Sequence, residues 1–158
     1  MSQTDATNAL PTRERLMRAA MGIVARDGMA AATTAAIAQE AQVAEGTLYR
    51  HFESKDDLLI SAYRQMKHDM FVRAAESIDP SLPPTERLMG AWKAVFLAYR
   101  GDRDAFAFGQ RFGESALADR EGGEAHRAIF KIVTDLRRAG VAAGVFQHLP
   151  VELLGNFF

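Results

Sequence analysis

Apolar residues in the first third of the chain recur at the spacing of buried helix faces. One such face is made by Leu16, Ala19, Ala20, Ile23 and Val24. Asp27-Gly28 after it is typical of a helix end, with the glycine in the left-handed conformation. A second helix is predicted to begin at Thr34 as its N-cap and to bury Ile37, Ala38 and Ala41. Val43 packs the turn that follows.

A third, short helix is predicted immediately after this turn. Leu48 and Phe52 lie four residues apart and therefore share one face, which anchors the helix. The remaining faces carry polar, aromatic and basic side chains between residues 45 and 55. Three helices with this order and these faces indicate a helix-turn-helix, whose second helix enters the major groove of DNA.

From residue 54 onward the pattern predicts further helices separated by breakers. Ser54 followed by Asp57 resembles a capping box that opens a long helix, and that helix has an apolar face made by Leu58, Leu59, Ala62, Tyr63, Met66, Met70 and Phe71. The proline-rich residues 79–84 end it, and a new apolar face follows at Leu88, Met89, Trp92, Val95, Phe96 and Tyr99. An aromatic segment at 103–112 and a helix from Ala125 to Gly140 complete an all-α pattern without strand-type alternation.

Residues 140–158 end in an apolar run. Leu149-Pro150 is typical of a helix entry, and the run after it has no polar end, with Val151, Leu153, Leu154, Phe157 and Phe158. We expect the natural chain to continue for a few dozen residues.

The polar residues of the short helix have the chemistry that DNA contact requires. Tyr49 can lay its ring along the sugar-phosphate surface and donate its hydroxyl to a phosphate, as Thr47 and His51 can also donate, while Lys55 supplies a cation. Base reading would fall to Glu45, which can accept from a cytosine amino group, and to Thr47, which can touch a thymine methyl. Gly46 lets the backbone approach closely.

The order of these residues resembles a known family. The residues that carry the resemblance are Gly28, Thr33-Thr34, Ile37-Ala38, Ala41, Val43, Gly46-Thr47-Leu48-Tyr49, His51-Phe52, Ser54-Lys55 and Leu58-Leu59. Across residues 13 to 60 the pattern is similar to the DNA-binding domain of the tetracycline-repressor (TetR) family of bacterial transcription regulators. Two positions depart from it: Gln42 stands where the turn usually has glycine, and Ala44 where a serine most often begins the recognition helix.

The resemblance implies a homodimeric, all-helical regulator. Its N-terminal domain would bind a palindromic double-stranded DNA operator, and its larger C-terminal domain would bind a small-molecule inducer that releases the DNA. The corresponding division is a flexible arm at 1–10, a helix-turn-helix domain at 11–57 and a helical regulatory and ligand-binding domain at 58–158. The positions that it places at the DNA surface are Thr34, Glu45, Gly46, Thr47, Tyr49, Arg50, His51 and Lys55.

Composition and charge limit the alternatives. A chain of 158 residues with 48% hydrophobic residues can bury an adequate core, and it has no cysteine for disulfides or thiol catalysis. It shows no apolar run long enough to span a membrane and no secretory signal at its start, so we expect a soluble, cytoplasmic protein. Because the formal net charge is -1, attraction to phosphate must come from the placement of cations, which predicts a modest salt dependence of DNA binding.

Aromatic residues in the second part of the chain are candidates for a ligand pocket, with ordinary core packing as the alternative: Trp92, Phe96, Tyr99, Phe108, Phe112 and Phe130. The histidines are scattered and no catalytic motif is present, so no metal, cofactor or catalytic residue is expected. A helical protein-protein adaptor or dimerisation module remains the other hypothesis. A regulator should bind fragments of its own promoter with an affinity that falls as salt rises, whereas an adaptor should not bind them.

Overall fold

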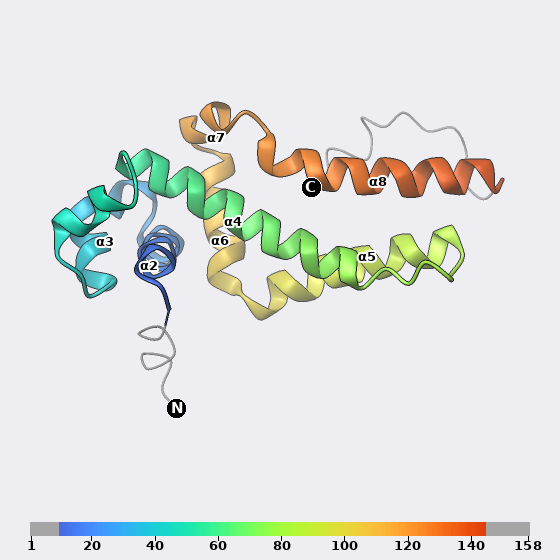
Figure 1. Cartoon of the computed structure of the whole chain (residues 1–158), viewed down its shortest axis with the longest axis horizontal. Helices are drawn as coiled ribbons and strands as arrows, with labels where there is room; N and C mark the ends of the chain where they lie inside the picture. The colour runs from blue at the N-terminus through green and yellow to red at the C-terminus, as the bar shows by residue number, and fades with distance from the viewer. Residues whose placement is uncertain (1–9, 145–158) are drawn as a thin grey trace. The chain divides into compact units, whose positions relative to one another are not determined.

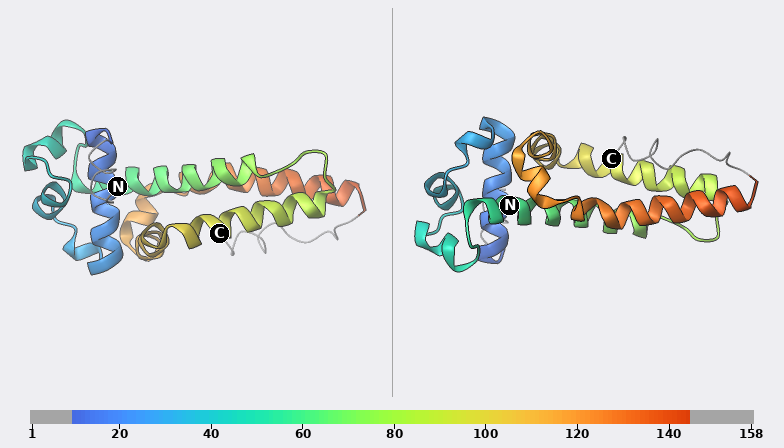
Figure 2. Two further views of the ribbon diagram at one scale, coloured as in Figure 1. Left: turned by 90° about the horizontal axis from the view of Figure 1, so that it is seen from below. Right: turned by 90° about the horizontal axis from the view of Figure 1, so that it is seen from above.

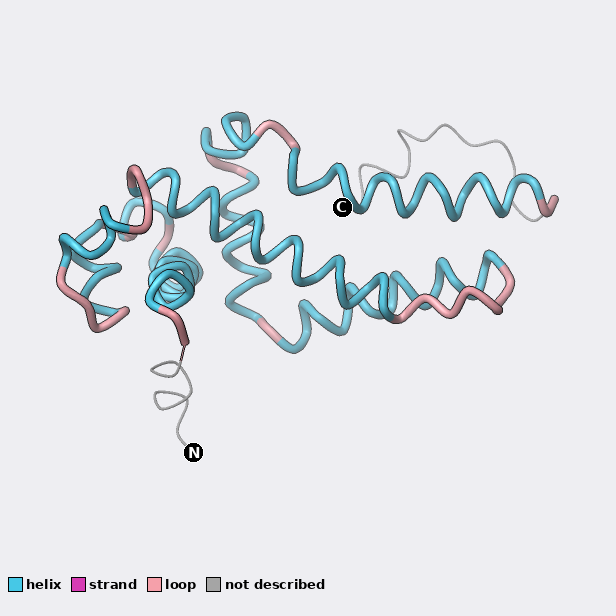
Figure 3. Tube along the Cα trace, in the orientation of Figure 1, coloured by secondary structure: helices cyan, strands magenta, loops and turns pink. Residues whose placement is uncertain are grey.

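The computed structural model of the protein describes residues 10–144, although within the last helix the side chains of 124–126, 128–130, 132, 133 and 136 are not described. All regular elements in this range are helices, as Figure 3 shows, which confirms the all-α prediction. They are α2 (Thr12–Asp27), η1 (Met29–Ala31), α3 (Thr34–Glu40), η2 (Glu45–Arg50), α4 (Lys55–Glu76), α5 (Pro84–Gly101), α6 (Arg103–Gly113), α7 (Ala116–Glu121) and α8 (Glu124–Ala142) (Figure 1). The helix entry at Leu149-Pro150 and the apolar run to Phe158 lie outside the described residues.

The chain divides into two compact units. The first consists of Met1–Met66 and Asp102–Gly122, and the second of Lys67–Gly101 and Gly123–Phe158. The first unit therefore includes α6 and α7, which follow residue 58 in the sequence, and α4 contributes residues to both units. The division into functional domains at residue 57 stays a prediction. None of the helices between residues 10 and 144 is both long and apolar enough to cross a bilayer.

The core of the first unit is built on α2. Its apolar face is buried as the spacing predicts, and α2 packs against α3 and extensively against α6. Phe108 and Phe112 of α6 are fully buried, and the Phe112 ring stacks on Tyr63 of α4 with centroids 4.2 Å apart. Arg111 Nη1 also donates to the carbonyl oxygen of Val24 at 2.7 Å. Burial of each large side chain contributes about 1.5–3 kcal/mol, so α6 is an integral part of the unit that carries the helix-turn-helix.

Three helix ends differ in detail from the sequence expectation. The N-cap of α3 is Thr33 and not Thr34, because Thr33 is the extended residue (ψ 157°) and its side chain accepts from Ala36 N at 3.2 Å. Gly28 has a positive φ of 91°, but its ψ of 171° is not left-handed helical, since the chain passes directly into η1. Helix α8 continues to Ala142, two residues past Gly140.

The capping box at the start of α4 is confirmed with one change. Ser54 Oγ accepts from Asp57 N at 3.1 Å, and Asp57 Oδ2 accepts in return from Glu53 N at 3.0 Å. The return bond reaches one residue further back than in the usual box, in which the N-cap nitrogen donates. Two ion pairs then join α4 to α7: Arg64 Nε lies 3.1 Å from the buried carboxylate of Glu121, and Arg120 pairs with Asp56.

The second unit is made by the second half of α4, α5 and α8, which run alongside one another (Figure 2). Its apolar cluster consists of Met70, Phe71 and Ala74 of α4 with Val95 of α5, and Ala94, Ala98 and Tyr99 pack against it. Met70, Phe71, Val95 and Tyr99 belong to the faces expected from the sequence.

Candidate nucleic-acid interface

The turn between α3 and η2 fixes the angle at which the recognition helix leaves the first helix. Val43 N donates to Ala38 O at 2.9 Å and Gln42 N donates to Gln39 O at 3.0 Å. These two bonds form a Schellman motif, which needs a left-handed residue after the last helical one. That residue is Gln42, with φ 55°. The departure from glycine noted in the sequence therefore leaves the geometry of the turn unchanged and puts a strained side chain at its centre.

Two arginines of α2 hold this turn and α3 in place. Arg15 Nη2 donates to the carbonyl oxygens of Ala41 and Gln42. Arg26 Nη1 lies 3.2 Å from Glu40 Oε1, and the hydrogen bond to this carboxylate raises the pKa of Arg26. Two of the cations near the helix-turn-helix are thus engaged by the protein itself.

Helix η2 is a 3-10 helix along its whole length, and at its start Thr47 N donates to Ala44 O at 2.8 Å. Ala44, the N-cap, offers no side-chain oxygen, as the sequence anticipates. Leu48 is 0% and Phe52 is 3% exposed, which confirms that this pair anchors the helix. The guanidinium of Arg13 covers the Phe52 ring at 4.7 Å from its centroid. A short and poorly capped helix is therefore held by tertiary burial of two side chains.

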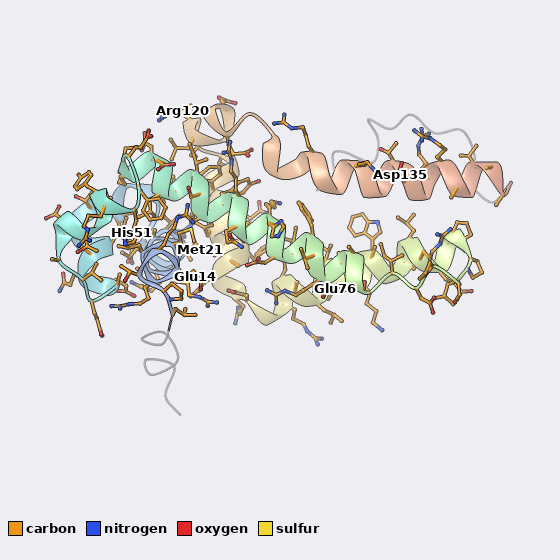
Figure 4. All side chains as sticks on the ribbon, viewed as in Figure 1. Glu14, Met21, His51, Glu76, Arg120 and Asp135 are labelled. Carbon is orange, nitrogen blue, oxygen red and sulfur yellow. The ribbon has the colours of Figure 1, made fainter. Side chains whose placement is uncertain are left out.

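The residues expected at the DNA surface are brought together along one outer edge of the first unit. Five of these residues are exposed: Glu45, Gly46, Tyr49, Arg50 and His51. The exposure of Tyr49 is the most informative, because its side chain is aromatic and is 58% exposed. His51, which is labelled in Figure 4, is the C-cap of η2. The other three positions are Thr34, Thr47 and Lys55, which are partly buried. This edge presents aromatic and basic side chains to solvent.

One contact within this edge was not expected from the sequence. Thr34 Oγ1 donates to Glu45 Oε1 at 2.6 Å, and this bond joins the first turn of α3 to the first turn of η2. Thr34 was predicted as a DNA contact in its own right. In the structure its hydroxyl orients the carboxylate that is predicted to read a base.

The aromatic pocket candidates fall in different units. Phe108 and Phe112 belong to the core of the first unit, whereas Trp92 and Phe96 are exposed on α5 and Tyr99 is half-buried in the second unit. The side chain of Phe130 lies outside the described residues. A residue that the sequence reasoning missed is Lys67, which is buried in the second unit. Its position four residues after Tyr63 and three before Met70 places it on the buried face of α4, and this spacing could have identified it.

A helix-turn-helix whose first helix buries Ile37 and Ala38, and whose second helix buries Leu48 while it exposes Tyr49 and Arg50, defines this chain as a DNA-binding regulator of the helix-turn-helix class. Residues 16–62 match the bacterial regulatory proteins of the tetR family. The helix-turn-helix transcriptional repressor KstR2 of Mycolicibacterium smegmatis is 33% identical over 150 residues, covering 92% of this chain and 73% of the relative. The repressor of the same name from Mycobacterium tuberculosis H37Rv is 29% identical over 156 residues, covering 92% and 74%.

Solved structures agree with these relatives. A tetR family transcription regulator from Shewanella sp. PV-4 superimposes with a TM-score of 0.84 at 25% identity, over 94% of this chain and 79% of that one. The regulator FadR from Bacillus subtilis, in complex with stearoyl-CoA, does so with a TM-score of 0.81 at 24% identity, over 91% and 79%. The chain belongs to the TetR family of bacterial transcription regulators.

Proposed function

We propose that this regulator represses transcription as a homodimer that occupies a palindromic operator and leaves it when a small molecule binds. The observation that carries the proposal is the exposed edge of η2, from Glu45 to His51, mounted on the buried pair Leu48 and Phe52. Repression is supported by the repressor relatives that span most of this chain. Because its target is chromosomal, we place its action in the cytoplasm.

In the proposed complex, η2 lies in the major groove. Tyr49 and Lys55 contact phosphates on either side and set the register, while Glu45 accepts from a cytosine amino group. A dimer with two such helices reads half-sites about 34–36 Å apart, or a multiple of that. RNA polymerase cannot occupy the same DNA, so binding alone represses.

Release follows from a shift between two conformations. Helix α4 begins at Lys55, five residues after η2 ends, and its residues from Lys67 onward belong to the second unit. A ligand bound in the second unit can therefore act on the recognition helix through one continuous helix. It does so only to the extent that it binds the released conformation more tightly than the DNA-bound one.

The test is DNA binding measured by fluorescence anisotropy with fragments of the protein's own promoter region. Tyr49→Ala and Lys55→Ala should weaken binding to all sequences alike, and Lys55→Ala should reduce the slope of log affinity against log salt by about one. Glu45→Ala should instead alter preference at one base position, at about 1–3 kcal/mol.

Arg103→Ala is the matched control, because Arg103 is an exposed cation at the start of α6, outside the helix-turn-helix. It should leave affinity and salt slope unchanged. Unchanged operator affinity in Tyr49→Ala would show that the assigned docking is wrong, and no complex at low salt would refute DNA binding altogether.

A further inference from the structure

Arg13 lies in the first turn of α2, outside residues 16–62, which match the tetR family. Its guanidinium covers the ring of Phe52, with Cζ 4.7 Å from the ring centroid, and its Nη1 donates to Met17 Sδ at 3.7 Å. Phe52 is 3% exposed and is one of the two side chains that anchor η2. A charged side chain of α2 therefore covers an anchor of the helix that we predict to enter the major groove.

The contacts of Arg13 differ in kind from those of two other arginines of α2. Arg15 donates to two carbonyl oxygens of the turn after α3, and Arg26 is paired with the carboxylate of Glu40. Arg13 contacts a phenyl ring and a thioether, which carry no charge. Neither contact neutralises the guanidinium, and the side chain is exposed to solvent. Its positive charge is therefore available to an anion.

The contact with Phe52 also determines where this charge lies. Phe52 directly follows His51 and precedes Lys55 by three residues, and both of these are predicted DNA contacts. A guanidinium has five N–H donors and can bind an aromatic ring and an anion at the same time. Because the ring already restricts the Arg13 side chain, less conformational freedom is lost when an anion binds it.

We propose that Arg13 binds a phosphate of the DNA backbone and is a further contact of the interface, in addition to Tyr49 and Lys55. This inference rests on the proposed function, because it adds a residue to the same docking. A planar guanidinium with several donors matches a phosphate group, and such a contact carries no sequence information of its own. It fixes the start of α2 on the duplex and, through Phe52, the end of η2.

Packing alone does not require a cation over Phe52. An unbranched apolar side chain such as methionine would cover the ring equally well, so the charge of Arg13 calls for a separate reason. The net charge of the chain supplies one. Because the formal value is -1, attraction to DNA depends on cations placed at the interface itself. Arg13 covers an anchor of η2 and adds such a cation beside it.

The experiment measures DNA affinity by fluorescence anisotropy between about 50 and 200 mM salt, with a fragment of the protein's own promoter region and with an unrelated duplex of the same length. Arg13→Met keeps a side chain over Phe52 and removes the charge. It should weaken binding to both duplexes and reduce the slope of log affinity against log salt by about one. The ratio of unaltered to variant affinity should therefore be about threefold larger at the lower salt concentration than at the higher one. Arg13→Lys retains the charge and should keep the slope.

Arg18→Met is the matched control. Arg18 is also an exposed arginine of α2, but it lies five residues further along and hence about 140° round the helix from Arg13. Its replacement should leave the slope unchanged. An equal loss of slope in Arg18→Met would overturn the inference, because the effect would then come from net charge and not from a contact.

An unchanged slope in Arg13→Met would also overturn it, since weaker binding at the same slope would mean only that Phe52 had lost its cover. So would weaker binding of the promoter duplex alone, which would make Arg13 a reader of sequence. Urea unfolding shows whether each variant is folded, and Arg13→Gln is measured if Arg13→Met is not. The proposed function fails separately, when the unaltered protein does not bind its promoter at low salt.

Discussion

Replacement of Lys67 by methionine should make this protein more stable at neutral pH. Burial lowers the pKa of Lys67 in the folded protein to about 8, compared with 10.5 for a lysine exposed to water. At 1.36 kcal/mol per pKa unit, the charged amine costs the folded state about 3 kcal/mol. The substitution also removes the hydrogen bond that Lys67 Nζ donates to the Tyr99 hydroxyl, which contributes about 1 kcal/mol. We therefore expect Lys67→Met to raise the free energy of unfolding by about 1–3 kcal/mol at pH 7.

The stabilisation by Lys67→Met should decrease as the pH rises. Between about pH 8 and pH 10.5 the unfolded chain holds a proton on Lys67 that the folded chain has released. The stability of the unaltered protein therefore rises with pH in this window, through this group, and the cost of the lysine disappears above it. Below pH 8 both states are protonated and the full cost is present. At pH 9.5 the cost should have fallen to less than half of its value at pH 7.

Urea unfolding at pH 7 and pH 9.5, followed by circular dichroism, measures this difference. Other titrating groups change the stability of both proteins with pH. One of them is Tyr99, whose pKa is raised by burial. The comparison of Lys67→Met with the unaltered chain at each pH removes much of that background. The control Lys93→Met, which replaces an exposed lysine on α5, should differ from the unaltered chain by less than about 0.5 kcal/mol at either pH. A Lys67→Met protein that is less stable at pH 7, or a gain that does not shrink at pH 9.5, would refute the reasoning.

Two further substitutions test the helix-turn-helix. Gln42→Gly should stabilise the protein by about 0.5–1 kcal/mol. Glycine adopts φ 55° without the strain that a side chain has there, and relief of this strain outweighs the cost of glycine's greater freedom in the unfolded chain. A lower urea midpoint than that of the unaltered protein would contradict this. Thr34→Val should change the base preference at the same operator position as Glu45→Gln, because it removes the 2.6 Å bond that orients the carboxylate. Selection of preferred operators from a randomised library measures the base preference of the Thr34→Val and Glu45→Gln proteins. If Thr34→Val only weakened all sequences alike, Thr34 would be a phosphate contact and not a positioning residue.

Predictions from the sequence agreed best with the structure where a feature depends on residues that are close together in the chain. Helical spacing alone identified the buried pair Leu48 and Phe52, and the Ser54–Asp57 cap followed from neighbouring residues. The N-cap of α3 was misplaced by one residue because Thr33 and Thr34 have the same capping chemistry. The path by which the chain leaves η1 selects between them, and that path is not encoded in either threonine.

Aromatic residues show the limit of the same reasoning. Phe112 and Phe96 both stand on apolar helix faces, yet Phe112 is fully buried against Tyr63 and Phe96 is 65% exposed. Periodicity states which face of a helix is apolar, but not which other helix covers that face. The separation of the candidates into two units therefore emerged only from the tertiary structure.

By itself, the sequence determined the helical class, the helix-turn-helix and the exposed edge that we predict to face DNA, because these depend on contacts between residues within a few turns of one another. Tertiary structure alone decided that α6 joins the first unit, that Thr34 orients Glu45, and that Lys67 is buried beside Tyr99. Each of these pairings joins positions well separated along the chain. Which distant residues meet is set by the packing of whole helices, and no local pattern contains that choice.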